Sequence, residues 1–199
     1  FVFCCFNNTY KFTPTTLDGW GRILEQVKGS VLLIYTSNES AKINLAKEIV
    51  LRGIDSSRLI FGKRLPKPEY LARYRVADLF LDTLPFNAGT TASDALRMGL
   101  PVLTCMGNSF ASRVAASVIN AVNLPELITT TQEQYESLAI ELATHPEQLK
   151  IIKDKLANNL STAPLYDTPL FTKHLESAYL TMYDRYQQGL EPDHIYVEH

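Results

Sequence analysis

The chain has 199 residues, of which 46% are hydrophobic and 20% charged, a composition typical of one ordinary globular domain and not of a disordered or fibrous protein. Its 19 Lys and Arg against 21 Asp and Glu give a net charge of -2, so it lacks the basic field of a general nucleic-acid binder. No apolar run is long enough to span a membrane and no signal peptide is visible, so we expect a cytoplasmic location with neither a nucleic acid nor a membrane as partner. Because the first residue is Phe inside an apolar run, we interpret the chain as part of a longer protein.

Five short apolar runs predict buried strands, and the segments between them have helical spacing. The runs are residues 1–6, 31–35, 59–61, 79–81 and 102–104. Helices are predicted from Thr13-Pro14 to Gly29, over 39–52 before Gly53, from Pro68 to Val76, over 90–98 before Gly99, and over 112–122. Because the strands are apolar throughout, helices must cover both sheet faces. This predicts an α/β fold with a Rossmann-like, doubly wound parallel sheet.

Beyond residue 130 the pattern is purely helical. Thr131-x-x-Gln134 is a capping box ahead of one helix, and a second helix follows Pro146. After a break at 161–166, Thr168-Pro169 is expected to cap a last helix that reaches about Gln188, and a polar tail covers 192–199. We therefore divide the chain into an α/β domain at 1–160 and a C-terminal helix with its tail at 161–199.

The last predicted helix carries more large apolar side chains than one narrow stripe needs. They include Phe171, Tyr179, Met182, Tyr183 and Tyr186. We predict that part of this helix exposes an apolar patch through which the chain self-associates.

Polar segments follow three of the predicted strands. They are residues 7–11, 65–70 and 82–91. Ligands of open α/β sheets bind outside the carboxyl ends of the strands, so these segments are the candidate binding site.

The segment 82–91 is the most informative, because Gly89, Thr90 and Thr91 open a helix. Free N–H groups and the helix dipole favour an anion there, glycine lets a ligand approach the backbone, and two hydroxyls add donors. Asp94, one turn further on, is placed to accept a hydrogen bond from a ribose hydroxyl. The structural alternative is that Thr90 is an N-cap and Asp94 an acid that suits the dipole. Neither G-x-G-x-x-G nor a P-loop motif is present, which argues against a nicotinamide dinucleotide and excludes a P-loop.

Two lysines belong to the other two segments. Lys11 follows the first strand, and Lys67 lies between the third strand and its helix. Each alone fits a solvated loop residue. Together with a helix N-terminus at the same sheet edge they suit a diphosphate, because charge-assisted hydrogen bonds are strong.

No pattern indicates a metal site or a general base. Cys4, Cys5 and Cys105 lack metal-ligand spacing, and we interpret them as buried, reduced thiols of a cytosolic protein. Asp78 and Asp82 flank one strand and are too far apart to share an ion, and we interpret Asp78 as a helix-to-strand junction residue. None of the 4 histidines falls in the three segments, so no general base of the usual kind is visible.

Four stretches of the chain resemble the carboxyl-terminal half of the catalytic region of the O-linked N-acetylglucosaminyltransferases, glycosyltransferase family 41, in its bacterial repeat-linked type. They are Phe6-Asn7-Asn8-x-Tyr10-Lys11, Ala77-Asp78-x-x-Leu81-Asp82-Thr83, Asn87-x-x-Thr90-Thr91-x-x-Asp94 and Ala111-Ser112-Arg113-Val114-Ala115-Ala116-Ser117. The end of the last helix, through Pro192-Asp193-His194, is also similar to the family's end. The resemblance covers essentially the whole chain, in order and without large gaps.

This resemblance implies a GT-B architecture, in which two Rossmann-like domains face each other across a cleft. Residues 1–160 are then the second domain, which holds the nucleotide-sugar donor, and 161–199 pack back toward the first. The implied activity is that of an inverting, metal-independent protein O-glycosyltransferase without a cofactor, which transfers N-acetylglucosamine from UDP-GlcNAc to Ser or Thr. The acceptor protein would bind to the first domain and to tetratricopeptide repeats outside this chain, so the chain alone is expected to be inactive.

The resemblance implies that four residues lie at the donor diphosphate. Lys11 matches the catalytic lysine that contacts the diphosphate and stabilises the leaving uridine diphosphate. Asn8 takes the place of a polar residue beside it. Thr90 and Thr91 match a hydroxyl and amide pair at the same group.

Five further positions are implied to lie at the nucleoside. Lys67 and the backbone around Leu65 match the segment that holds the uracil and ribose, Asp94 matches the acid on the ribose, and Arg73 lies near the base. Tyr70 stands where the animal enzyme has a histidine that stacks on uracil, and an aromatic ring can still stack.

The sugar is left open by the resemblance. Gly89 stands where the animal enzyme has a second histidine at the diphosphate and sugar. Relatives of this type transfer N-acetylglucosamine, glucose or fucose, and fucose would bring a guanosine donor. A non-catalytic nucleotide-binding module is the alternative from another class, although the retained Lys11, Thr90, Thr91 and Asp94 speak against it.

Overall fold

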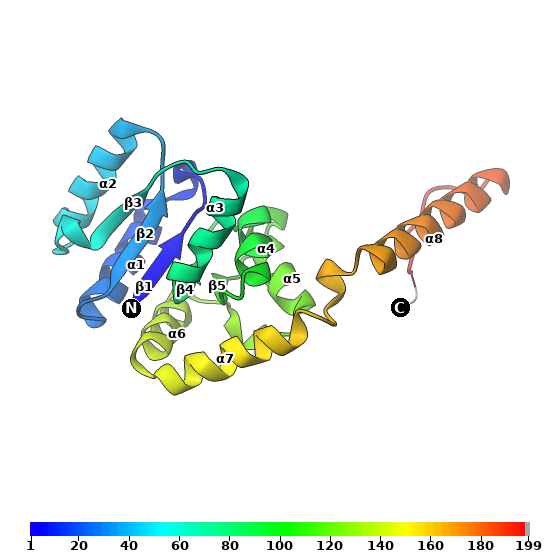
Figure 1. Ribbon diagram of the computed structural model, residues 1–199. Helices are drawn as coiled ribbons and strands as arrows, with labels where there is room; N and C mark the ends of the chain where they lie inside the picture. Colours follow the sequence, from blue (N-terminus) through cyan, green and yellow to red (C-terminus); the bar gives the residue numbers. More distant parts are fainter. Residues whose placement is uncertain (198–199) are drawn as a thin grey trace.

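The computed structural model describes residues 1–197, which form a six-stranded parallel sheet flanked by helices (Figure 1). The strands are β1 (Val2–Cys5), β2 (Val31–Tyr35), β3 (Leu59–Gly62), β4 (Leu79–Leu81), β5 (Val102–Cys105) and β6 (Ile128–Thr129). Their order in the sheet is β3-β2-β1-β4-β5-β6, and every neighbouring pair is parallel. This is the strand order of a Rossmann-like doubly wound sheet, which confirms the predicted fold class.

Helices flank this sheet, and the last of them, α8, extends beyond it. Within residues 1–197 the α-helices are α1 (Pro14–Gln26), α2 (Glu39–Leu51), α3 (Lys67–Arg73), α4 (Thr90–Arg97), α5 (Val114–Ala121), α6 (Gln132–Thr144), α7 (Pro146–Asn159) and α8 (Thr168–Gln187). Helix α1 contacts α2 and α6, while α4 contacts α5. Right-handed connections put these two groups on opposite faces of the sheet. Within residues 1–197 no helix has both the length and the apolar composition that crossing a membrane requires.

Most predicted elements form, and their ends have identifiable signals. Strands β2 and β4 coincide with the predicted runs. The side chain of Thr13 accepts a hydrogen bond from the Thr16 N–H and begins α1, as predicted. Gly53 and Gly99 follow α2 and α4 with positive φ values of 78° and 80°, a conformation that glycine adopts without steric cost.

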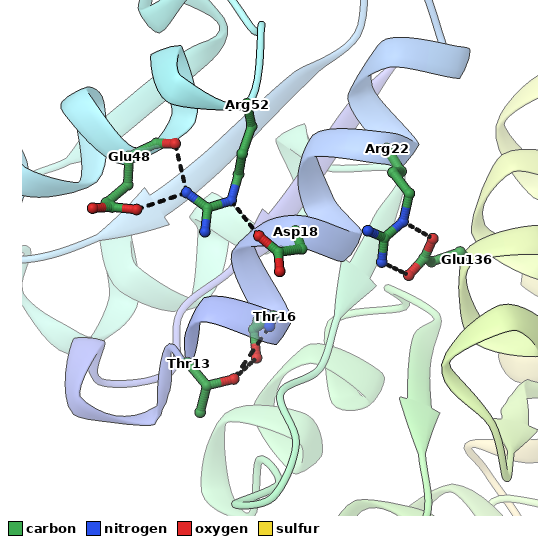
Figure 2. A network of polar contacts seen from close by, with 7 residues as sticks. All are labelled: Thr13, Thr16, Asp18, Arg22, Glu48, Arg52 and Glu136. Atoms are coloured by element: carbon green, nitrogen blue, oxygen red, sulfur yellow. Dashed lines mark hydrogen bonds and ion pairs between the residues drawn. The ribbon is translucent and has the colours of Figure 1, made fainter.

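Polar contacts at the surface connect α1 to its two neighbouring helices (Figure 2). Arg22 on α1 forms a two-pronged ion pair with Glu136 on α6, with both N···O distances 2.7 Å. Arg52, at the end of α2, binds Asp18 on α1 and Glu48 on its own helix, also at 2.7 Å. In each pair one partner is about half exposed and the other is mostly covered, so solvent still screens the charges and each pair contributes on the order of 1 kcal/mol.

Three details of the predicted elements are wrong. The sixth strand, β6, was not among the predicted strands, because two residues give no readable periodicity. The predicted helix over 112–122 forms as α5, with a 3-10 turn at Phe110–Ser112 before it. The Gln134 side chain accepts from the Thr130 N–H and hydroxyl instead of closing the box on Thr131. Helix α8 is capped by Asp167, whose carboxylate accepts from the Leu170 N–H, and not by Thr168.

The three cysteines lie in the core, as predicted. Cys4, Cys5 and Cys105 are buried and free, and each lies on one of the strands β1 and β5. Burial raises the pKa of all three thiols, because the charged form would be desolvated. The thiols are therefore packing groups in this domain.

Helix α8 projects away from the sheet and its helices (Figure 1). None of its residues is buried. Its large apolar side chains are exposed, among them Phe171, Leu175, Tyr179, Leu180, Met182, Tyr183 and Tyr186. The predicted apolar patch is thus present, and the last two residues of the predicted tail, 198–199, lie outside the described residues.

Candidate functional site

The three predicted segments meet at the carboxyl edge of the sheet. The Lys11 ammonium, after β1, donates to the Asn87 carbonyl in the loop after β4 at 2.8 Å. The Lys67 ammonium, at the start of α3, binds the Asp94 carboxylate on α4 at 2.9 Å. Strands β1 and β4 are neighbours at the centre of the sheet, where the strand order reverses. A doubly wound sheet binds its ligands at this position.

Lys11 ends a 3-10 turn, Thr9–Lys11, that carries it from β1 over the loop after β4. Its ammonium lies 3.8 Å from the centre of the Phe86 ring as well as on the Asn87 carbonyl. Partial burial lowers the pKa of Lys11, and the negative Asp82 nearby opposes that shift. The side chain therefore presents a partly desolvated positive charge at the sheet edge.

The start of α4 is open to an anion. Gly89 is the N-cap, and no side chain within the described residues caps this end of the helix. The first N–H groups of α4 are thus free of a side-chain acceptor, which is the arrangement that binds phosphate groups. Thr90, which follows Gly89, is exposed and is the first helical residue. The structural alternative, Thr90 as N-cap, is therefore wrong.

The hydroxyl of Thr91 is engaged inside the protein. It donates to the Asn7 side-chain oxygen at 2.6 Å. The Asn7 amide is oriented by its other end, where Nδ2 donates to Asp82 at 3.0 Å and to the Thr83 hydroxyl at 2.8 Å. The prediction that both threonine hydroxyls add donors for an anion is thus wrong for Thr91, whose proton is already used. Its backbone N–H, in the first turn of α4, keeps the predicted place.

Asp82 is the buried centre of this polar network. Its carboxylate accepts from Asn7, from the Ala88 N–H at 2.7 Å and from the Thr104 hydroxyl at 2.7 Å. Burial raises its pKa to about 6, although these hydrogen bonds oppose the shift. By closing the loop onto Ala88, Asp82 fixes the chain just before the open end of α4.

Asp78, at the other end of β4, behaves as the predicted junction residue. Its carboxylate accepts from the Val2 N–H at 2.9 Å and pairs with Lys153 at 3.3 Å. Asp78 and Asp82 thus serve separate contacts.

The segment after β3 contacts α4 through Lys67 and Tyr70. Lys67 is largely exposed and is neutralised by Asp94, so it does not stand as a second free charge beside Lys11. The hydroxyl of Tyr74 donates to the Thr91 carbonyl at 3.3 Å, so the Tyr70 hydroxyl donates to that of Tyr74. This turns the polar end of Tyr70 inward and fixes the plane of its half-buried ring.

Arg73 holds the loop that precedes α3. Its guanidinium donates to the Lys63 carbonyl at 2.9 Å and lies 4.2 Å from the centre of the Phe6 ring. Gly62 makes room for it, since a Cβ there would lie 2.7 Å from Nη1 of Arg73. Leu65, in the same loop, is half-buried. Arg73 therefore connects the loop before α3 to the Phe6 ring next to β1.

Asn8 and Gly89 make few contacts. The Asn8 side chain is exposed and makes no capping bond, while its carbonyl accepts from the Lys11 N–H at 3.0 Å. A Cβ added to Gly89 would meet only Val114, at 3.6 Å, so the backbone there has room for a side chain. Asn8 and Gly89 thus lie at the carboxyl edge of the sheet, where no side-chain contact among the described residues holds either of them in place.

Sequence reasoning missed several residues that build the site. They are Asn7, Tyr74, Asp82, Phe86 and Asn87, of which Asn7, Tyr74, Asp82 and Asn87 are buried. The sequence held one indication of them, because the candidate binding segments 7–11 and 82–91 include Asn7, Asp82, Phe86 and Asn87. Their partners lie 75 or more positions away in several cases, so no local pattern reveals them.

The sheet order and the open helix start at its switch point define a Rossmann-like domain, the class in which ligands bind at this position. Comparison with known proteins makes this specific, because the family described as Glycosyl transferase family 41 matches residues 1–175. The chain belongs to glycosyltransferase family 41.

Individual relatives agree with this assignment. The chain is 37% identical to the UDP-N-acetylglucosamine--peptide N-acetylglucosaminyltransferase of Caenorhabditis elegans, over 98% of this chain and 17% of that protein. A solved structure of a mutant Thermobaculum terrenum O-GlcNAc transferase superposes with a TM-score of 0.89 at 32% identity, over 94% of this chain and 37% of the other. An α,α-trehalose 6-phosphate synthase of Burkholderia multivorans shares the fold alone, with a TM-score of 0.60 at 10% identity over 98% of this chain and 45% of the other. The chain thus spans a minor part of the relatives it matches.

Proposed function

We propose that this chain is the donor-binding domain of an inverting protein O-glycosyltransferase that transfers N-acetylglucosamine from UDP-GlcNAc to Ser or Thr. Membership of family 41 and the activities that the C. elegans and T. terrenum relatives are named for support this. The observation that carries the proposal is the meeting of the Lys11 ammonium with the uncapped start of α4 at one sheet edge. These are two sources of positive potential, and each of them favours a diphosphate.

In the proposed reaction the acceptor hydroxyl displaces the diphosphate at the anomeric carbon. Negative charge then develops on the β-phosphate, and the Lys11 ammonium with the N–H groups of Thr90 and Thr91 stabilises it. Asn8 and Gly89 line the same region. The acceptor and any base would lie in the rest of the full-length protein.

The nucleoside is proposed to lie against α3 and the second turn of α4. Asp94 accepts from the ribose, with Lys67 holding its carboxylate, and the Tyr70 ring stacks on the base. Arg73 and the backbone around Leu65 shape the base-binding loop. Because the site offers no side chain at Gly89, glucose or fucose in place of N-acetylglucosamine is the competing donor.

Residues 161–199 are proposed to pack against the first catalytic domain of the full-length protein. The apolar side chains of α8 have no cover from residues 1–160, which supports this. Acceptor proteins would bind through that first domain and its tetratricopeptide repeats. We further propose a cytoplasmic location, which agrees with three free, buried thiols.

A thermal-shift panel on the full-length protein tests the donor. UDP-GlcNAc and UDP should raise the melting temperature through binding to the native state, while GDP and GDP-fucose should not. UDP-glucose as the strongest ligand would change the sugar, and GDP-fucose would change both sugar and base. No shift with any nucleotide would overturn the proposed donor site. A shift with a nucleotide but no donor turnover by the full-length protein would support the non-catalytic nucleotide-binding module.

A further inference from the structure

Phe86 is a large apolar side chain at the proposed catalytic edge, where it is 43% exposed. A single exposed apolar side chain is common on protein surfaces, so the contacts of its ring decide what Phe86 does. Its ring lies beneath the Lys11 ammonium, with 3.8 Å between Nζ and the ring centre. A cation this close to an aromatic face is attracted by the ring quadrupole.

The next residue completes the contact. The Asn87 carbonyl accepts a hydrogen bond from Lys11 Nζ at 2.8 Å, so two consecutive residues hold one ammonium. The carbonyl takes one of its three protons, and the ring covers a second side. An ammonium has three donors, so it keeps donors for a ligand after this one hydrogen bond to the carbonyl.

The loop that supplies both contacts is held rigidly. The Thr83 hydroxyl donates to the Phe86 carbonyl at 2.7 Å, and the Asn87 side chain donates to the Thr83 carbonyl at 2.8 Å. The Asn87 N–H also donates to the Ala111 carbonyl at 2.9 Å. The ring of Tyr10 packs against that of Phe86, with 6.2 Å between their centres. Phe86 is thus fixed from both its backbone and its ring.

We propose that Phe86 is a positioning residue for Lys11: its ring holds the ammonium in the direction in which it meets the developing charge of the diphosphate. This rests on the proposed catalytic role of Lys11. A flexible lysine stem has many rotamers, and a fixed ring with a fixed carbonyl selects among them before the donor binds.

The test uses the full-length enzyme and three substitutions of Phe86. Phe86→Leu keeps an apolar side chain without a π-system, and kcat should fall about tenfold, within the range of a partly desolvated cation–π contact. The KM for UDP-GlcNAc should change less than about threefold, because orientation matters most as charge develops. Phe86→Tyr and Phe86→Trp keep the aromatic face and should retain most of kcat. Phe110→Leu, the same change at an 89% exposed position after β5, is the matched control and should act as wild type.

A double-mutant cycle with Lys11→Ala distinguishes the positioning role of Phe86 from the catalytic role of Lys11. If Phe86 acts through Lys11, the Lys11→Ala enzyme should have almost the same kcat with and without the added Phe86→Leu substitution. Wild-type kcat in Phe86→Leu, or a Phe86→Tyr and Phe86→Trp pair as slow as the leucine variant, would overturn the inference. Normal turnover by the Lys11→Ala enzyme would instead overturn the proposed role of Lys11.

Discussion

Replacing Lys11 with alanine should affect catalysis far more than folding. In the folded domain the ammonium makes one hydrogen bond to a backbone carbonyl and one contact with an aromatic ring. Losing both costs about 1–2 kcal/mol of unfolding free energy, which lowers the melting temperature by only a few degrees. The side chain is not part of the apolar core, so no cavity forms.

The expected loss of rate is much larger. In the transition state Lys11 faces a diphosphate that gains negative charge, and such a contact contributes about 3–4 kcal/mol. Its removal should slow sugar transfer on the order of 10²–10³-fold. Lys11→Arg should restore little, because a planar fork replaces a compact charge that is fitted between a ring and a carbonyl.

The assay measures melting temperature and single-turnover rate for the same full-length variant, so that folding, binding and chemistry are separated. Lys47→Ala is a matched control, because it removes an exposed lysine from α2, outside the site. Near-normal transfer by Lys11→Ala would show that Lys11 does not stabilise the leaving diphosphate. Unfolding of that variant would show that its role is structural.

Four further predictions concern the buried acid, the isolated chain, its last helix and metals. Burial raises the pKa of Asp82 to about 6, so the folded state binds the proton of this carboxyl group more tightly than the unfolded state does. The resulting stabilisation is fully present below about pH 4 and is lost as the pH rises through 6. Asp82→Asn should therefore remove up to about 3 kcal/mol of pH dependence from denaturant unfolding curves between pH 4 and 7, and parallel curves for both proteins would contradict this. The 199-residue chain alone should give no sugar transfer to a peptide that the full-length enzyme modifies, and measurable transfer would refute the assignment of the acceptor side to the missing part. Light scattering of the 199-residue chain over a concentration series should show self-association that Tyr179→Glu on α8 weakens, whereas a strict monomer at all concentrations would count against the apolar patch. Dialysis of the full-length enzyme against EDTA should leave its transfer rate unchanged, and a loss restored by a divalent cation would disprove the metal-independent mechanism.

Much of the fold was readable because its signals are local. Apolar runs gave five of the six strands, and glycines after α2 and α4 gave the helix ends. The cap of α8 was misplaced by one residue because Asp167 and Thr168 are both good caps and the sequence does not choose between them. Strand β6 was missed because pairing with β5, not its own pattern, makes it a strand.

The candidate site was predictable at the level of segments and not of contacts. Lys11 and the start of α4 could be placed because the carboxyl ends of parallel strands share one edge. The engagement of the Thr91 hydroxyl by Asn7 could not, since their hydrogen bond joins residues 84 positions apart. The pairing of Lys67 with Asp94 was hidden for the same reason, and it changes the charge that the site offers.

The central position of β1 means that the domain consists of two half-sheets joined along one seam. Strands β1 and β4 pair at Phe3 with Leu79 and at Cys4 with Phe80, and β1 pairs with β2 on its other side. The contacts of Asn7 with Asp82 and of Lys11 with Asn87 cross this seam at its carboxyl end. A nucleotide held by both sides would act as a further cross-link there. The contacts that join the two halves of the sheet at this end are therefore also the contacts that place Lys11 and the start of α4 in the site.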